Sequence, residues 1–204
     1  MNEKKWQVLL DELQQEFCQA NLNHTEELAK MFVEHAPPSK FPRVLDIGVG
    51  EGCSEIDVLE ARGYSVHGIS IIPWMDESTR ITIMDMHDQK FPLGSFDAAF
   101  STQVFEHSYS PWLLLMETWV TIRKEGRLFI SLPYYGTHVS VHHPSDLPFV
   151  EWAYAIEQVG FDILYNEDKS ILREKCTIIV AEKGKPPTMK MRKALGELEK
   201  LRIS

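Results

Sequence analysis

The sequence predicts an α/β domain built around a mostly parallel β-sheet. From residue 43 onward, short runs rich in β-branched and aromatic residues alternate with helical or loop-like stretches, which is the pattern of a parallel sheet with crossover connections. One such run, residues 44–47, leads directly into a turn with three glycines and then a helical stretch. The last two runs, residues 161–165 and 176–182, leave no room for a crossover helix between them, so they should pair antiparallel.

The N-terminal part of the chain is predicted to be helical. Apolar side chains recur at helical spacing in two stretches, residues 6–17 and 28–32, and the second follows a capping-like sequence at residues 23–26. Pro37 and Pro38 should end the second helix, because proline lacks the amide donor and restricts the residue before it. We therefore expect two amphipathic helices before the sheet begins.

The other elements follow from the same periodicities. Strands are expected at residues 44–47, 65–70, 81–84, 96–101 and 127–132, ahead of the two antiparallel strands. Helices are expected at residues 54–62, 111–123 and 148–158. A last amphipathic helix is indicated by Met191, Leu195, Leu198 and Leu201.

These elements divide the chain into three parts. Residues 1–38 form an N-terminal helical cover or lid, residues 39–184 the α/β core, and residues 185–204 a basic tail helix. The apolar stripe of the N-terminal helices must be buried, either beside the sheet or over its carboxyl edge, and the second placement would make them a lid. The tail helix packs either on its own domain or on a second subunit, so a homodimer through the terminal helices stays open.

Composition and charge narrow the class of protein. The 204 residues are 44% hydrophobic and 25% charged, which is enough to bury one core. The longest apolar runs fall far short of a membrane helix, and the charged start carries no signal sequence, so a cytoplasmic protein is expected. The net charge of −9 opposes binding to a phosphate backbone, although residues 183–204 alone carry a net charge of +5. Any nucleic acid would have to bind this basic tail, and we consider such a partner a minor alternative.

The segment at residues 44–52 points to a cofactor site. Three glycines between a strand and a helix let a ligand approach the backbone, and the helix N-terminus offers free amides. This pattern is shared with dinucleotide-binding folds. Asp46, however, is placed to attract an ammonium group, and Glu51 within the turn would repel a pyrophosphate. The acids therefore favour a cofactor that ends in an α-amino acid.

The glycine turn and four later segments together resemble class I S-adenosylmethionine-dependent methyltransferases, in particular the small type 11-like group. The segments are residues 84–88, 91–97, 101–107 and 124–133, in the family's order and spacing. The resemblance implies a doubly wound, Rossmann-like methyltransferase fold with a seven-stranded, mostly parallel sheet and an antiparallel last strand. It also implies S-adenosyl-L-methionine as cofactor and methyl transfer to a small-molecule oxygen or nitrogen acceptor.

The resemblance also implies which residue binds each part of the cofactor. Gly48, Gly50 and Gly52 would line the methionine moiety, and Asp46 would anchor its amino group. Asp85 would accept a hydrogen bond from the adenine amino group, with Met86 beside it. Near the sulfonium and the ribose, the implied residues are Ser101, Gln103, Ser70 and Ile71.

One residue that is typical of the family, the acid that binds the ribose, is replaced in this chain. The second strand of these enzymes usually ends in an acid that binds both ribose hydroxyls, whereas here it ends in Ser70. Serine can make one such hydrogen bond but no bidentate charged pair. Asp76 or Glu77 in the loop that follows is the alternative ribose ligand.

Methyl transfer needs in-line positioning and usually a base that deprotonates the acceptor. The candidate bases are Glu106 and His107, after the fourth strand, and a cluster on the loop after the fifth: Tyr134, Tyr135, His138, His142 and His143. Of these we favour His107, Tyr134, His142 and His143. Packing against the adjacent helix is the alternative role for His107, and support of a helix cap is the alternative for one loop histidine. We expect the neighbouring Glu106 to cap a helix N-terminus.

A divalent metal is a further alternative at these residues. Some quinone-type O-methyltransferases of this superfamily bind one through acids and a histidine around the same Glu-His pair. Here Gln103 stands where a further acid would be wanted, which leaves Glu106, His107 and His143. The sequence therefore predicts no metal.

Two other functions stay open. The chain could bind the cofactor without independent turnover, as a regulatory or partner-dependent subunit, since Ser70 replaces the ribose ligand and no large substrate domain is inserted. It could also be an RNA- or DNA-associated methyltransferase that docks through the basic tail, which predicts binding that collapses with salt.

Overall fold

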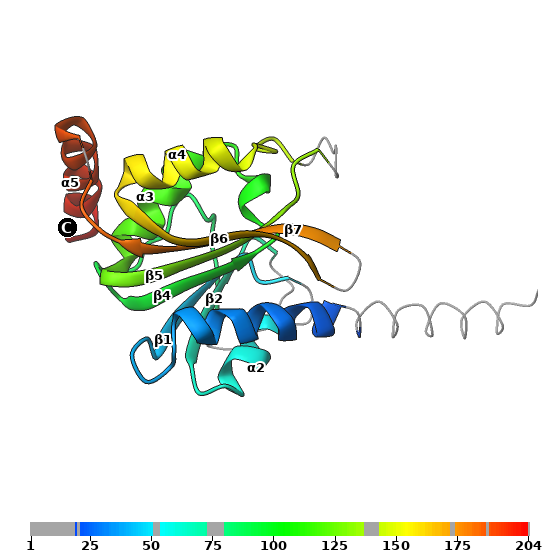
Figure 1. The fold of residues 1–204 in the computed structure, drawn as a ribbon. Coiled ribbons are helices and arrows are strands. Elements are labelled where there is room, and N and C mark those ends of the chain that lie inside the picture. Colours follow the sequence, from blue (N-terminus) through cyan, green and yellow to red (C-terminus); the bar gives the residue numbers. More distant parts are fainter. Residues whose placement is uncertain are drawn as a thin grey trace, which may run out of the picture.

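The computed structural model describes residues 19, 21–50, 54–72, 80–136, 143–171, 174–186 and 188–203. Within them, seven strands form one sheet in the order β3-β2-β1-β4-β5-β7-β6 (Figure 1). All neighbours pair in parallel except β7, which is antiparallel to both β5 and β6. The predicted doubly wound sheet with an antiparallel last strand is confirmed.

Most elements lie where the periodicities place them. The strands are β1 Arg43–Ile47, β2 Ser65–Ser70, β3 Ile81–Ile83, β4 Phe96–Thr102, β5 Ile122–Pro133, β6 Phe161–Ile171 and β7 Glu174–Lys183. The helices after the sheet begins are α2 Ser54–Glu60, the 3₁₀ turn η1 Phe105–His107, α3 Pro111–Thr121, α4 Phe149–Val159 and α5 Met189–Ile203.

The β6–β7 hairpin is longer than predicted. Residues 166–170 are polar and resemble a connection, yet they pair with β7 along the whole ladder. The reason is that β6 is the edge strand of the sheet, and most of its outer half faces solvent. Backbone pairing to β7 satisfies its amides without requiring apolar side chains.

The sheet is covered on both faces, as the chain's path through Figure 1 shows. One face buries a cluster that includes Phe100 and Phe129 under the N-terminal helix and α2. The other face buries a second cluster that includes Leu45 and Ile130 under α3 and α4. Because the chain winds from β1 to β3 in one direction and then returns to β4 beside β1, a switch point lies between β1 and β4. Ligands bind at such points, beyond the carboxyl ends of the strands.

The N-terminal helix is continuous over residues 21–35, so the helix start predicted at residues 23–26 is wrong. Asn23 accepts a hydrogen bond from Gln19 one turn earlier and does not cap the helix (3.0 Å). Phe32 is fully buried and packs its ring against three aromatic rings of the core, those of Tyr64, Phe100 and Phe129. This helix therefore covers a face of the sheet, and the first predicted helix lies outside the described residues.

The first turn of the N-terminal helix reaches the carboxyl edge of the sheet. The Nδ1 atom of His24 lies 3.3 Å from a carboxylate oxygen of Glu174, at the start of β7. Thr25 is buried and its hydroxyl donates to Glu55, at the start of α2 (3.4 Å). His24 and Thr25 thus lie beside the edge where ligands bind in such sheets.

The tail helix α5 packs on its own domain. Leu195 is buried, and the guanidinium of Arg202 forms an ion pair with the buried Glu117 of α3. The same guanidinium donates to the backbone oxygen of Phe91 (2.8 Å) and to the hydroxyl of Thr121 (3.0 Å). Of the two placements left open by the sequence, the structure has the intramolecular one.

Across the described part of the chain, none of the helices combines the length and the apolar character needed to cross a bilayer.

Candidate active site

The glycine turn after β1 lies at the switch point of the sheet. Backbone amides of Gly48 and Val49 both donate to the carbonyl of Ile69 in β2, at 3.0 and 2.9 Å. These two bonds hold the turn against the end of β2.

Asp46 supplies a buried negative group beneath this turn. Its side chain is almost fully buried, and its Oδ2 atom has no hydrogen-bond partner among the described residues. Burial, followed by the nearby charge of Glu55, raises the pKa of Asp46 well above its usual range. A buried carboxylate without a partner is costly. A cationic ligand group would relieve that cost.

The two described glycines of the turn have different roles. Gly48 has a φ of +87°, and a Cβ there would lie 2.4 Å from a methyl carbon of Val104. Gly50 is exposed, its backbone lies outside the left-handed region, and a Cβ there would meet none of the described residues within 4 Å. Gly48 is therefore required by the protein itself, whereas Gly50 borders open space. The third glycine, Gly52, lies outside the described residues.

The end of β2 offers only a weak polar group. Ser70 is buried, and its hydroxyl accepts the backbone N–H of Ile72 (3.2 Å). Ile71 is 71% exposed beside it. Asp76 and Glu77, the alternative ribose ligands, lie outside the described residues.

The predicted adenine ligand follows β3. The Asp85 carboxylate accepts the backbone N–H of His87 (2.8 Å) and lies 2.7 Å from its Nδ1 atom. The backbone hydrogen bond, more than the side-chain one, holds the pKa of Asp85 below its usual range. The other ring nitrogen of His87 lies 2.7 Å from the hydroxyl of Ser108. Met86, the other residue predicted here, packs against the α3–α4 side of the core.

At the end of β4, two predicted residues make contacts within the protein. Ser101 is fully buried, and its hydroxyl donates to the carbonyl of Ile47 in β1 (2.9 Å). Gln103 has a φ of 54°, a left-handed conformation that is uncommon for a residue with a side chain. Its Nε2 atom donates to the hydroxyl of Ser131 (3.3 Å). The strand thus ends in a constrained turn, as often occurs at functional sites.

Glu106 differs from the sequence prediction. The turn η1 begins without any side-chain cap, so the predicted capping role of Glu106 is wrong. Its side chain is 2% exposed, and Oε2 has no hydrogen-bond partner in the described structure. Burial, reinforced by the charge of Asp146, raises the pKa of Glu106 to about 7. Sequence reasoning named Glu106 as a candidate base and metal ligand but favoured a structural role, because burial on a short turn leaves no periodic signal.

Two of the candidate bases meet beside Glu106. The rings of His107 and His143 lie 4.7 Å apart between centroids, and Nε2 of His107 is 3.9 Å from Oε1 of Glu106. Tyr134 follows β5, is 38% exposed, and has the ammonium group of Lys175 over its ring. His142 lies outside the described residues. The structure therefore brings proton-accepting groups from two loops together.

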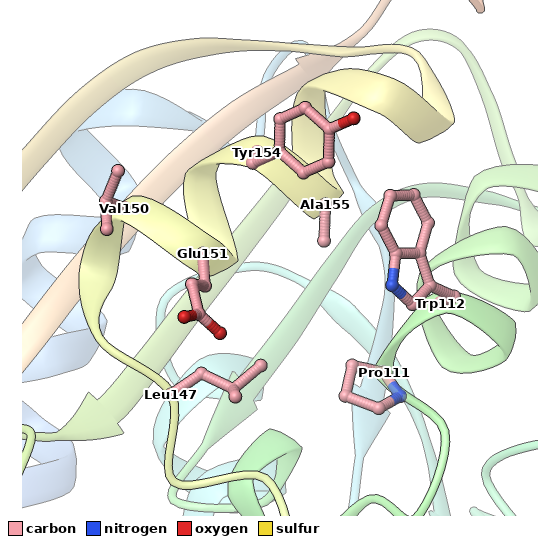
Figure 2. A pocket seen from close by; sticks show the side chains of 7 residues that line it. All are labelled: Pro111, Trp112, Leu147, Val150, Glu151, Tyr154 and Ala155. Carbon is pink, nitrogen blue, oxygen red and sulfur yellow. The ribbon is translucent and has the colours of Figure 1, made fainter.

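A separate pocket of about 430 Å³ lies between α3 and α4, on the outer layer of helices (Figure 2). Its lining is mostly apolar and comes from the start of α3, the segment just before α4, and α4 itself. The lining residues are Pro111, Trp112, Leu147, Val150, Glu151, Tyr154 and Ala155. None of the predicted cofactor ligands lines this pocket, so it is distinct from the glycine turn.

Comparisons with known proteins agree with this geometry. The family described as a methyltransferase domain matches residues 11–167. None of the curated proteins compared matches the chain.

Solved structures match over most of the chain at low sequence identity. The first is in a complex between the Trm112 methyltransferase activator of Haloferax volcanii and a protein assigned as a methyltransferase, with a TM-score of 0.66 and 17% identity over 80% of this chain and 90% of that one. Geranyl diphosphate C-methyltransferase from Streptomyces coelicolor has a TM-score of 0.61 and 15% identity, over 76% of this chain and 77% of that one. An S-adenosylmethionine-dependent methyltransferase from Mesorhizobium loti has a TM-score of 0.57 and 16% identity, over 69% of this chain and 90% of that one.

Proposed function

The chain belongs to the methyltransferase domain family of class I S-adenosylmethionine-dependent enzymes, and on that premise we propose that it methylates an oxygen or nitrogen atom of a small molecule. The observation that carries the cofactor assignment is the buried Asp46 carboxylate, whose Oδ2 atom has no hydrogen-bond partner among the described residues, in the strand that leads into the turn containing Gly50. An α-amino acid end group fits both features, because its ammonium would pair with the carboxylate.

The cofactor would supply an electrophilic methyl group on a sulfonium. The turn at Gly48 and Gly50 would hold its methionine part, and Asp46 would orient the amino group. Ser70 and Asp85 would hold the ribose and the adenine, at the ends of the next two strands. Their hydrogen bonds to Ile72 and His87 orient these side chains before any ligand arrives.

The protein's own share of the chemistry is to position the acceptor and take its proton. Glu106, His107 and His143 lie together beyond β4, and their side chains are of the kinds that act as general bases. A carboxyl group with a pKa of about 7 is suited to this task. Tyr134 and His142 stay in the proposal as further candidates from the loop after β5.

A small acceptor is favoured over a nucleic acid by the charges. The chain has a net charge of −9, which repels phosphate. The basic tail helix is docked on the domain, and Arg202 is committed to its ion pair with Glu117. Fewer tail charges are therefore available to a nucleic acid than the sequence suggests.

The experiment is methyl transfer from radiolabelled S-adenosylmethionine into a fractionated extract of small metabolites, followed by a panel of phenols, carboxylates and amines. Label should appear in a small-molecule fraction and require the parent protein, with a Gly50→Val variant as the matched control. Label found only in the RNA or protein fraction would overturn the small-molecule proposal.

A second candidate is a subunit that needs a partner for turnover. The observation that favours it is the similarity to a chain in the complex of the Haloferax volcanii Trm112 activator. This candidate predicts that the purified chain binds S-adenosylhomocysteine yet transfers no methyl group until extract protein is added. Turnover by the purified chain alone would exclude it.

A further inference from the structure

We propose that Glu106, His107 and His143 form a binding site for a divalent first-row transition metal, which holds an oxygen atom of the acceptor. The proposal rests on the proposed function and narrows its acceptor. One ligand atom from each of the three side chains can be chosen so that all lie within 4.8 Å of one another. A modest closure around an ion would bring all three to bonding distance.

The fold holds the two loops of this site together. Glu106 and His107 belong to η1, directly after β4, whereas His143 precedes α4. Ser145 links the loops, since its backbone N–H donates to the carbonyl of Glu106 (3.1 Å). Its hydroxyl also donates to the carbonyl of Ser108 (2.5 Å). The ligand set is therefore positioned by hydrogen bonds that do not involve the ligands' own side-chain atoms.

Burial of Glu106 independently points to a ligand. The residue is only 2% exposed, yet Oε2 of its carboxylate has no hydrogen-bond partner among the described groups. Buried carboxylates are normally paired, hydrogen-bonded or bound to a metal. The imidazoles of His107 and His143 lie beside this carboxylate, and neutral imidazole is a common metal ligand.

The donor set selects the kind of ion. Two imidazole nitrogens and one carboxylate suit zinc, cobalt, iron or manganese, whereas magnesium prefers oxygen ligands only. Gln103, which stands where another acid would make the set richer in oxygen, is instead turned to Ser131. Magnesium should therefore bind far more weakly than zinc.

Three protein ligands leave coordination positions open. In catalytic sites such positions hold water or substrate, and the metal lowers the pKa of a bound hydroxyl. The site lies beyond the carboxyl end of β4, next to the strand that leads into the glycine turn. The acceptor atom is accordingly an oxygen of a phenol, hydroxyl or carboxylate group, and not an amine.

The test measures metal binding directly, with tag-free, metal-stripped protein. Titration with Zn²⁺ by calorimetry, and with Co²⁺ by visible absorbance, should show one equivalent bound and a nitrogen-containing coordination spectrum. Glu106→Gln and His143→Ala should each weaken binding by at least about tenfold, since even outer-shell substitutions cost 10–100-fold. His35→Gln is the matched control, because that ring stacks on Tyr165 at another site.

Circular dichroism and S-adenosylhomocysteine affinity of each variant show whether the fold and the cofactor site are intact. His143→Ala, on a surface loop, keeps the test valid if Glu106→Gln does not fold. Absence of stoichiometric Zn²⁺ and Co²⁺ binding by the parent, or binding that both variants retain, would overturn the metal site. Metal binding without any methyl transfer would instead count against the proposed function alone.

Discussion

Replacing Gly50 with valine separates the cofactor site from the fold. Among the residues that the structure describes, none lies within 4 Å of a Cβ at this position, and the backbone there needs no left-handed conformation. The protein should therefore tolerate Gly50→Val with a change in unfolding free energy of less than about 0.5 kcal/mol, as for a surface site. The added methyl groups enter the space assigned to the ligand. Overpacking of about 1–3 kcal/mol would weaken cofactor binding roughly 5- to 150-fold.

The matched comparison is Gly48→Ala, two residues earlier in the same turn. An alanine at a φ of +87° costs about 1–2 kcal/mol. Its Cβ would also lie 2.4 Å from a carbon of Val104, which adds about 1–3 kcal/mol of overpacking. We expect a loss of about 2–5 kcal/mol in stability from this smaller substitution.

The assay combines urea unfolding with calorimetric titration of S-adenosylhomocysteine on the same preparations. Gly50→Val should keep the parent's midpoint and lose affinity, while Gly48→Ala should lower the midpoint. If Gly50→Val is folded and binds like the parent, the cofactor does not lie against this turn, and the assignment is wrong.

Four other outcomes are expected. Asp97→Asn should cost about 1.5–3 kcal/mol at pH 7. Burial raises the pKa of Asp97, but hydrogen bonds from two arginines outweigh it and lower the pKa. Stability from this carboxylate is therefore present above its unfolded pKa of about 4 and lost as the pH falls through the folded value, so urea curves of parent and variant should converge below pH 4. Arg202→Met should destabilise by about 3–5 kcal/mol by leaving Glu117 buried and unpaired, and pairing it with Glu117→Leu should restore the thermal midpoint. Ser70→Asp should tighten S-adenosylhomocysteine binding about tenfold, because a hydrogen bond to a charged group contributes about 1.5–3 kcal/mol before desolvation; no gain in calorimetry would place the ribose elsewhere. Deleting residues 1–18 should leave the melting temperature unchanged but weaken cofactor binding and abolish turnover if they act as a lid, and retained activity would refute the lid.

The positions of most strands and the antiparallel pairing of the last two were predictable from local patterns. A buried strand followed by a glycine turn and a helix is a short-range signal, because side-chain periodicity and turn residues reflect backbone conformation directly. Gly48 shows the limit of that signal. Nothing in its sequence neighbours distinguishes it from Gly50, and only the folded structure shows the φ of +87° and the approach of Val104 that exclude a side chain there.

The N-terminal helix and the hairpin show where local patterns mislead. A capping-like sequence at residues 23–26 predicts a helix start, but the apolar stripe that includes Phe32 is buried on the sheet and the helix continues through it. The polar residues 166–170 read as a loop, yet pairing with β7 extends the strand. In both cases a tertiary surface stabilises a conformation that propensity alone disfavours.

By itself the sequence determined the fold class, the glycine turn and an acid placed to receive an ammonium group, since these depend on residues close together in the chain. The tertiary structure decided how the charges at the site are placed. Burial leaves one carboxylate oxygen each of Asp46 and Glu106 without a hydrogen-bond partner among the described residues, and the Ser145 hydrogen bonds hold the loop of His143 against that of Glu106. Desolvation and contact between distant segments exist only once the chain is packed, and they give these carboxylates their chemistry.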